Sequence, residues 1–204
     1  MLQIDVKKTI LLVVVICLHN AFASAKNSVW LEKLDSILAV SENIVAEKNN
    51  KIAMLKQMAA KETNTSLLLE RYWELSEEYY VFKFDSAKIY VEKGLALARK
   101  TNNRRYVVAN SIMLAKLLAI GGLYSEAISN LSKINPESLE PDLLFDYHIA
   151  YFTIYSYWAD YCNDDTYSPI YMEKSNACLV KAVDIIDKHS EAYDYYVGKY
   201  HFYV

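Results

Sequence analysis

Histidine and acidic side chains are the residues of this sequence that could act in catalysis or bind a metal. After residue 25 the histidines are His148, His189 and His201, and none has a second histidine at the helical spacing of a zinc site. The run 163–165 (NDD) lacks the alternating carboxylates and terminal glutamate of an EF-hand loop, so it is interpreted as a polar turn. The GxSxG motif and glycine-rich nucleotide loops are absent. The sequence therefore predicts no catalytic residue, no cofactor and no metal.

Tyrosine is the most informative residue type. Twelve of the 18 tyrosines lie between residues 147 and 203. Four aromatic residues recur at i, i+4, i+8 and i+11, which places them on one face of a helix. They are Tyr147, Tyr151, Tyr155 and Trp158. Two interpretations stay open: the four residues pack in the core between helical hairpins, or they line a binding groove. Asp142 and Asp146 would add an acidic rim to such a groove and favour a peptide with basic residues.

The net charge of −3 gives the chain no basic field for nucleic acid. The basic residues that do cluster are Arg99, Lys100, Arg104 and Arg105. This cluster is interpreted as a helix C-terminus that complements the helix dipole, followed by a solvated turn, in preference to a phosphate site.

Helices are the elements that must position these residues. The chain is 53% hydrophobic and has only four glycines and three prolines, which disfavours an all-β fold. Apolar residues recur at spacings of three and four in most segments. The predicted helices span residues 28–61, 67–82, 85–98, 104–120, 124–134, 142–161 and 170–188, with another beginning near 191. Gly121 and Gly122 are predicted to end a helix in the left-handed conformation, and Pro141 is predicted to begin one.

Two segments repeat the same pattern, in which an aromatic residue precedes an alanine by three and a large apolar residue follows the alanine by four. The pairs are Phe84 with Ala87 and Tyr124 with Ala127. Helices approach closely only where a small side chain lies at their crossing, so the alanines are predicted to lie at helix contacts. The aromatic residues would fill the gap at each turn. A third copy is predicted at residues 168–186, with Ala177 and Ala182 in the small positions.

This pattern resembles the tetratricopeptide repeat (TPR), and the stretch GGLYSEAISNL, residues 121–131, carries its glycine, aromatic and alanine positions. The resemblance covers residues 67–190. It implies an all-α fold of antiparallel helical hairpins stacked as a short right-handed superhelix, an α-solenoid, here preceded by one long helix. It also implies that the first helix of each hairpin lines a concave inner surface.

The stretch YYVFKFDSAKIY, residues 79–90, is also similar to a group of uncharacterised Bacteroidetes regulators. In that group an exported TPR sensor region precedes a transmembrane helix and a cytoplasmic regulatory domain. The present sequence has no second hydrophobic span and stops inside an apparent helix, residues 191–204. The chain is therefore expected to be a truncated part of such a protein, attached to the membrane only through a missing downstream segment.

Residues 1–25 are predicted to be a signal peptide, because Lys7 and Lys8 precede a short apolar run and small residues follow it. As a helix, the run of about ten residues would span about 15 Å, half of a bilayer core. Cleavage is expected after Ala23 or Ala25, which would place the protein in the periplasm. Two cysteines follow, at positions 162 and 178, and they are interpreted as core residues in preference to a disulfide.

The predicted organisation is a signal peptide (1–25), a long N-terminal helix (26–66), TPR-like repeats (67–190) and the start of a further helix (191–204). The favoured function is an exported protein-interaction module that binds a protein or peptide, as the sensor or scaffold part of a larger membrane-bound regulator. The alternative is a periplasmic domain that senses a small ligand or glycan in an aromatic pocket. An enzyme is not expected, and the sequence leaves the oligomeric state open.

Overall fold

A computed structural model describes the backbone of residues 6–204 and the side chains of residues 29–204. Every regular element of this part of the chain is a helix, which confirms the all-α prediction. The elements are α1 (Val6–Lys61), α2 (Thr65–Tyr80), α3 (Phe84–Lys100), α4 (Arg104–Ile120), α5 (Tyr124–Leu131), the short 3₁₀ helix η1 (Pro136–Ser138), α6 (Pro141–Cys162), α7 (Tyr167–Val183) and α8 (Tyr193–Tyr203).

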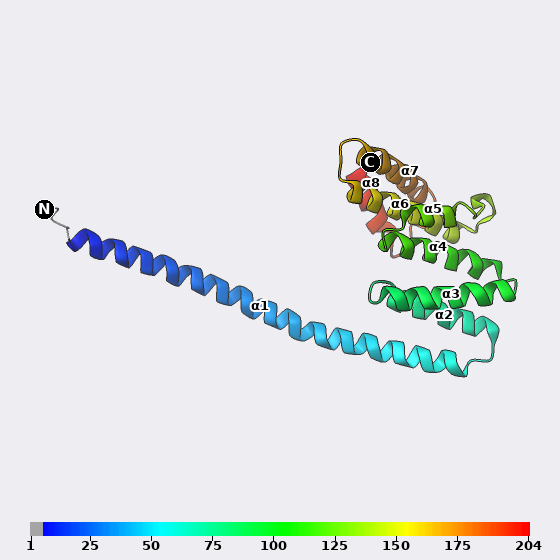
Figure 1. Ribbon diagram of the computed structural model, residues 1–204, viewed down its shortest axis with the longest axis horizontal. Coiled ribbons are helices and arrows are strands. Elements are labelled where there is room, and N and C mark those ends of the chain that lie inside the picture. Colours follow the sequence, from blue (N-terminus) through cyan, green and yellow to red (C-terminus); the bar gives the residue numbers. More distant parts are fainter. Residues whose placement is uncertain (1–5) are drawn as a thin grey trace. The chain divides into compact units, whose positions relative to one another are not determined.

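The chain divides after Lys51 into two units. The second unit, residues 52–204, contains the end of α1 and all later helices. In this unit consecutive helices pack as antiparallel hairpins: α2 with α3, α4 with α5, and α6 with α7 (Figure 1). Helix α4 also packs against α3 and α6, which joins each hairpin to the next. The result is a short stack of hairpins, as expected for a solenoid.

For residues 6–28 the structure describes the helical backbone of α1 but not the side chains. Residues 1–25, predicted to be a signal peptide, lie outside the residues whose side chains are described. From residue 29 to 45, α1 exposes many of its apolar side chains, among them Trp30, Leu34 and Leu38. Among the described residues, no helix combines the length and the apolar character needed to cross a membrane.

Three of the turns inside the stack each use one residue with positive φ. Asn102 (φ 54°) lies between α3 and α4, Gly122 (φ 77°) between α4 and α5, and Asn163 (φ 44°) between α6 and α7. Of the two adjacent glycines, only Gly122 is left-handed, because Gly121 has φ −77°. Gly121 has a different function: a Cβ at this position would lie 3.3 Å from Cζ of Phe84, so its lack of a side chain leaves room for that ring.

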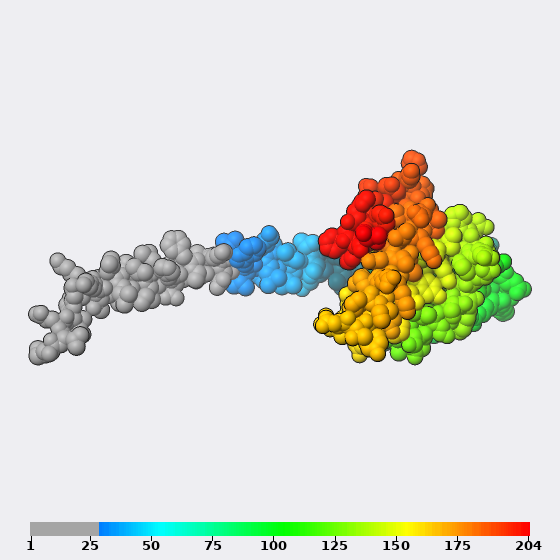
Figure 2. Space-filling view, turned by 90° about the horizontal axis from the view of Figure 1, so that it is seen from above, coloured from blue at the N-terminus to red at the C-terminus, as the bar shows by residue number. Residues whose placement is uncertain are grey.

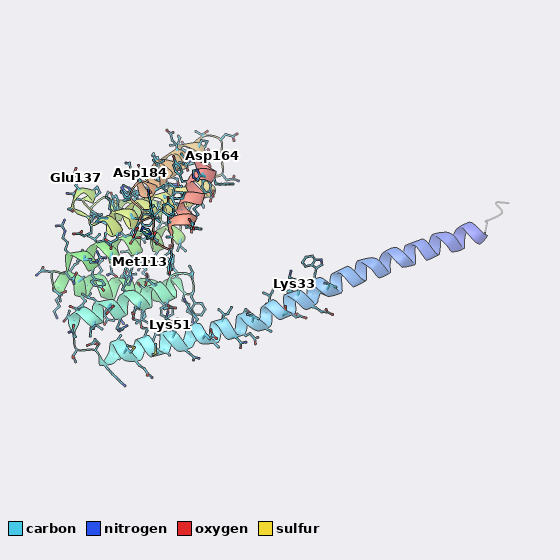
Figure 3. The ribbon with its side chains drawn as sticks, turned by 180° about the vertical axis from the view of Figure 1, so that it is seen from behind. Lys33, Lys51, Met113, Glu137, Asp164 and Asp184 are labelled. Atoms are coloured by element: carbon cyan, nitrogen blue, oxygen red, sulfur yellow. The ribbon has the colours of Figure 1, made fainter. Side chains whose placement is uncertain are left out.

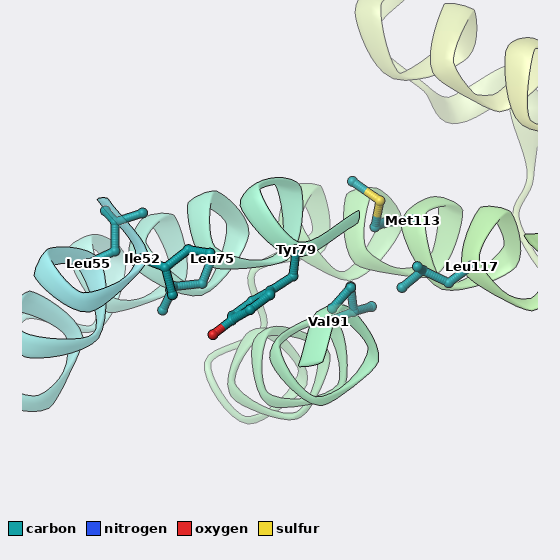
Figure 4. Close-up of a cluster of buried hydrophobic side chains, with 8 residues drawn as sticks. Ile52, Leu55, Leu75, Tyr79, Val91, Met113 and Leu117 are labelled. Atoms are coloured by element: carbon teal, nitrogen blue, oxygen red, sulfur yellow. The ribbon is translucent and has the colours of Figure 1, made fainter. Parts of the chain in front are cut away.

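The core of the second unit begins with residues from four helices. Ile52 and Leu55 of α1 pack with Leu75 and Tyr79 of α2 and with Val91 of α3, together with residues of α4 (Figure 4). All five side chains are buried. The last turns of α1 are therefore part of the stack and cover its first hairpin.

The small residues at the helix crossings are buried as the repeat pattern predicts. Ala87 and Ala127 are both 0% exposed. Tyr124 fills the joint by stacking on Trp158, with ring centroids 5.5 Å apart. In the third copy Ala182 is buried, but Ala177 is exposed, so its predicted position was wrong.

Ser175 takes the small position of the third copy. Its side chain is 0% exposed, and its hydroxyl donates a hydrogen bond of 2.8 Å to the backbone carbonyl of Phe152. A buried serine meets the size requirement of the crossing because its one polar group has a partner.

Several helix boundaries differ from the sequence prediction, among them the start of α1, which is Val6 where residue 28 was expected. Helix α5 ends at Leu131, before the expected residue 134, because the chain tightens there into the turn that leads to η1. Helix α7 begins at Tyr167 instead of 170, since proline is tolerated in a first turn and Pro169 lies there. The Asp164 carboxylate accepts hydrogen bonds from the backbone N–H groups of Thr166 and Tyr167, both at 2.7 Å. The NDD run is thus a polar turn, as predicted.

Helix α7 also ends early, at Val183, and a loop leads from it to α8. Figure 2 shows α8, in red, on the surface of the stack beside the orange residues of α7. The loops that precede and follow α6 lie at opposite ends of that helix, where Figure 3 labels Glu137 and Asp164. Ring contacts and burial show that α8 packs through Tyr196 and Tyr200 on the core of α6 and α7.

Candidate functional site

A groove lies on the face that α2, α4, α6 and α8 share. It encloses a cavity of about 220 Å³. Aromatic rings and two lysines dominate its wall. The lining residues are Tyr80, Lys116, Ile149, Phe152, Thr153, Ser156, Tyr157, Tyr195, Tyr196 and Lys199. We call this surface the inner groove. Its position on the first helix of each hairpin agrees with the concave surface that the repeat pattern implies.

A second cavity, of about 310 Å³, adjoins the inner groove beneath the loop between α7 and α8. Phe145 and Asp146 line it, together with Ile185, Ile186 and neighbouring residues. The ring of Phe145 contacts the ring of Tyr196 edge to face, at 5.2 Å between centroids. Tyr196 lines the inner groove and Phe145 lines the second cavity, so this pair of rings lies between the two cavities.

The inner groove is lined by a partly buried lysine, Lys116, whose charge interacts with two nearby carboxylates. Burial lowers the pKa of Lys116, and the nearby charges of Asp146 and Glu77 act against that decrease. Burial likewise raises the pKa of Asp146 and of Glu77, although both residues keep an exposed surface. The three charged groups are therefore in a partly desolvated environment, where electrostatic interactions are stronger than in water.

Both lysines of the groove lie over aromatic rings. Nζ of Lys116 lies 5.0 Å from the ring centroid of Tyr80, and Nζ of Lys199 lies 4.8 Å from that of Tyr195. These distances are within the range of cation–π interactions. Burial also raises the pKa of Tyr80 to about 12 and raises that of Tyr196. The groove thus presents neutral phenols beside two ordered cations.

The aromatic stripe that the sequence predicts on α6 does not line the inner groove. Tyr147 is buried in the core cluster that also contains Ala127 and Leu131. Trp158 stacks between Tyr124 of α5 and Tyr171 of α7, at 5.5 Å and 4.3 Å. Tyr151 and Tyr155 continue this stack of rings, and Tyr155 also faces Tyr171 at 6.3 Å. The structure therefore places all four residues at the contacts of α6 with α5 and α7, and none of them lines the inner groove.

The two aspartates predicted as an acidic rim separate. Asp146 lies beside Lys116 at the groove. Asp142 is one turn earlier and forms an ion pair with Arg105 of α4, whose hydrogen bond lowers the pKa of the Asp142 carboxyl. Asp142 also lines the second cavity. Only Asp146 is thus close to the charged residues of the inner groove.

The sequence indicates only weakly which residues line the inner groove. Lys116 is the only charged residue in the apolar run 107–120 of α4, and a lone charge on a helix that packs on several sides is a candidate functional residue. Tyr80 and Tyr157 have no comparable signal, because the sequence does not show that α2 and α6 present the same face.

The cysteines at positions 162 and 178 are both free thiols. Burial raises the pKa of the Cys178 thiol, which packs against the cluster of α6 and α7. A partly buried thiol with a raised pKa is a poor nucleophile.

Residues 38–203 match the model of a protein family that is described as the SusR N-terminal TPR domain. Neither curated proteins nor solved structures include a significant match to the chain.

Proposed function

Because the chain belongs to the family of SusR N-terminal TPR domains, a helical-repeat family of protein-interaction modules, we propose that it binds a protein or peptide segment in the inner groove. The observation that supports this proposal most is the composition of the groove, which four helices build from tyrosines and two lysines. Tyrosine provides a large contact area at low entropic cost and keeps a polar tip, and it is enriched at binding hot spots. No catalytic step is part of this proposal.

The chemistry of the groove suggests the kind of segment that binds. The cavity of about 220 Å³ between the rings of Tyr80, Tyr157 and Tyr196 suits one apolar or aromatic anchor side chain. Asp146 lines the second cavity, and both Asp146 and Glu77 interact electrostatically with Lys116 of the groove. Carboxylates near the groove suit a basic residue beside that anchor. We therefore propose a peptide in which an apolar anchor is adjacent to a lysine or arginine.

A selection from a random peptide library tests the proposal. Peptides recovered on the immobilised chain are titrated by calorimetry against the wild type, Tyr157→Ala and Tyr167→Ala. Tyr157 lines the groove and is 43% exposed, while the control residue Tyr167 is 59% exposed and lies outside it. We expect Tyr157→Ala to weaken binding about tenfold or more, the effect of removing a hot-spot ring, and Tyr167→Ala to bind as the wild type does. Equal affinities of the two variants would contradict the location of the site.

We also propose that the chain is exported and forms the sensor or scaffold part of a larger membrane-bound regulator. The basic, apolar and small-residue sections of residues 1–25 support export. In this proposal the protein is periplasmic. N-terminal sequencing of the chain recovered from a periplasmic fraction tests export. A mature start at Ser24 or Lys26 is expected, and recovery only as a cytosolic chain that begins at Met1 would refute it.

A further inference from the structure

A separate cavity of about 340 Å³ lies at the junction of α3, α4 and the segment that follows α5. Three cations from three parts of the chain line it. Arg99 is in the last turn of α3, Arg104 is the first residue of α4, and Lys133 follows α5. The fold brings Lys133 to a basic cluster that the sequence shows only as a helix end and a turn. None of the residues around this cavity lines the inner groove.

The charge of this cavity is unbalanced. Its wall contains the three cations but no aspartate or glutamate. Within the described part of the chain, no ion pair joins Arg99, Arg104 or Lys133 to a carboxylate, whereas the adjacent Arg105 is paired with Asp142. Three like charges around one cavity repel one another, and an anion placed between them would relieve that repulsion.

The wall also supplies ordered polar groups. Nη2 of Arg104 donates a hydrogen bond of 2.6 Å to Oγ of Ser138, and that hydroxyl donates one of 2.8 Å to the carbonyl of Asn135. Nδ2 of Asn130 donates one of 2.7 Å to the carbonyl of the largely buried Ser111. Since a guanidinium has five N–H donors, Arg104 keeps donors for a ligand while Ser138 fixes its position. A ligand that binds such a side chain loses less side-chain entropy.

We propose that this cavity binds a small molecule through a phosphoryl group. A phosphate monoester carries close to two negative charges near neutral pH and three acceptor oxygens, which suits three cations that line one cavity better than a carboxylate does. The cavity extends beyond the cations to Val107, Val108 and Leu139, so the rest of the ligand contacts an apolar wall. An aryl or alkyl phosphate monoester is the ligand class that this combination favours. The proposal does not depend on the function of the inner groove.

Calorimetric titration of the full chain with phenyl phosphate, inorganic phosphate and benzoate tests the proposal. We expect phenyl phosphate to bind more tightly than inorganic phosphate, because the ring adds apolar contact, and benzoate to bind most weakly. Arg104→Gln and Lys133→Gln should each weaken the binding of phenyl phosphate about tenfold, the loss typical of one charge-assisted hydrogen bond. Lys100→Gln is the matched control, because Lys100 is exposed next to Arg99 but does not line the cavity.

The same experiment separates this site from a diffuse charge effect and from a lipid surface. Equal weakening by Lys100→Gln and Arg104→Gln, or equal affinity for benzoate and phenyl phosphate, would overturn the proposal. So would the absence of heat for both phosphates at millimolar concentration and low salt. Vesicles of phosphatidic acid with phosphatidylcholine form the last arm: binding to these vesicles without binding to free phenyl phosphate would also overturn it. Circular dichroism of each variant verifies that the helices remain intact.

Discussion

The two adjacent glycines at positions 121 and 122 act in different ways, and this difference can be tested. Gly122 has φ 77°, where any side chain is strained. Gly122→Ala should therefore lower the free energy of unfolding by about 1–2 kcal/mol, the cost of a left-handed conformation for an L-residue. Urea unfolding followed by circular dichroism measures it. Gly198→Ala is the control: Gly198 lies inside α8 with open space around its Cα, so alanine should raise stability by about 0.5–1 kcal/mol.

The opposite pair of results would contradict this assignment. If Gly122→Ala left the unfolding curve unchanged while Gly121→Ala shifted it strongly, Gly121 would be the residue that the turn requires. A moderate effect of Gly121→Ala is compatible with the structure, since a Cβ there would lie 3.3 Å from the Phe84 ring, which would have to move by a few tenths of an ångström.

Tyr80 makes stability depend on alkaline pH. Burial raises its pKa to about 12, whereas in the unfolded chain it is about 10. The folded state holds the proton more tightly, so the stabilisation is fully present below pH 10 and is lost as the pH rises through 12. Urea unfolding at a series of pH values measures this effect. Between pH 9 and 12, the free energy of unfolding of the Tyr80→Phe variant should fall by about 2 kcal/mol less than that of the wild type.

Lys116 changes the free energy of unfolding in the opposite direction over the same pH range. Its lowered pKa makes the folded state more stable as the pH rises. Both proteins retain Lys116 and a ring beneath it, so the difference between their pH profiles isolates the Tyr80 hydroxyl. Identical profiles would contradict burial of this hydroxyl.

Individual residues of the repeat were predictable where a single side chain decides the geometry. The alanines at 87 and 127 and the aromatic residues at 84 and 124 follow from spacing alone, because a helix crossing excludes larger side chains. Ser175 could not be found in this way. Its hydroxyl is acceptable in the core only because the Phe152 carbonyl lies within hydrogen-bond distance, and that contact exists only after α6 and α7 have packed.

At the scale of the element, the crossing of α4 and α5 allows a direct test of the repeat. Ala127 is 0% exposed, whereas Ala177 on α7 is exposed. Ala127→Leu should overpack the crossing and lower the free energy of unfolding by about 1–3 kcal/mol. Ala177→Leu adds the same atoms where there is room, so its effect should stay within about 0.5 kcal/mol. Thermal and urea unfolding of the two variants measure this contrast, and a larger loss for Ala177→Leu would place the third repeat differently.

Most helix boundaries were predictable to within a few residues, but the start of α1, the end of α7 and the face of α6 that lines a site were not. Both faces of this helix carry aromatic residues at helical spacing, so the sequence left core and groove open for the stripe. Helices α5 and α7 settle its packing, because Tyr124 and Tyr171 stack on Trp158. Thr153, Ser156 and Tyr157, which form the groove wall, have weaker periodicity and could be identified only once α2, α4 and α8 were placed around them.

At the scale of the whole molecule, α1 belongs to two units. Truncation of a leucine should therefore change the free energy of unfolding by different amounts in the two parts of this helix. Leu55 is 4% exposed in the core of residues 52–204, while Leu38, in the preceding unit, is 53% exposed. Leu55→Ala should therefore lower the free energy of unfolding by about 2–5 kcal/mol, the cost of a core truncation. Leu38→Ala should change it by no more than about 0.5 kcal/mol. Both substitutions remove the same atoms from the same helix, so helix propensity cancels in the comparison.

Urea unfolding at low protein concentration measures both values. An equal loss for Leu38→Ala would mean that the first part of α1 is also buried against protein in solution, and that the cooperative unit extends beyond residue 51.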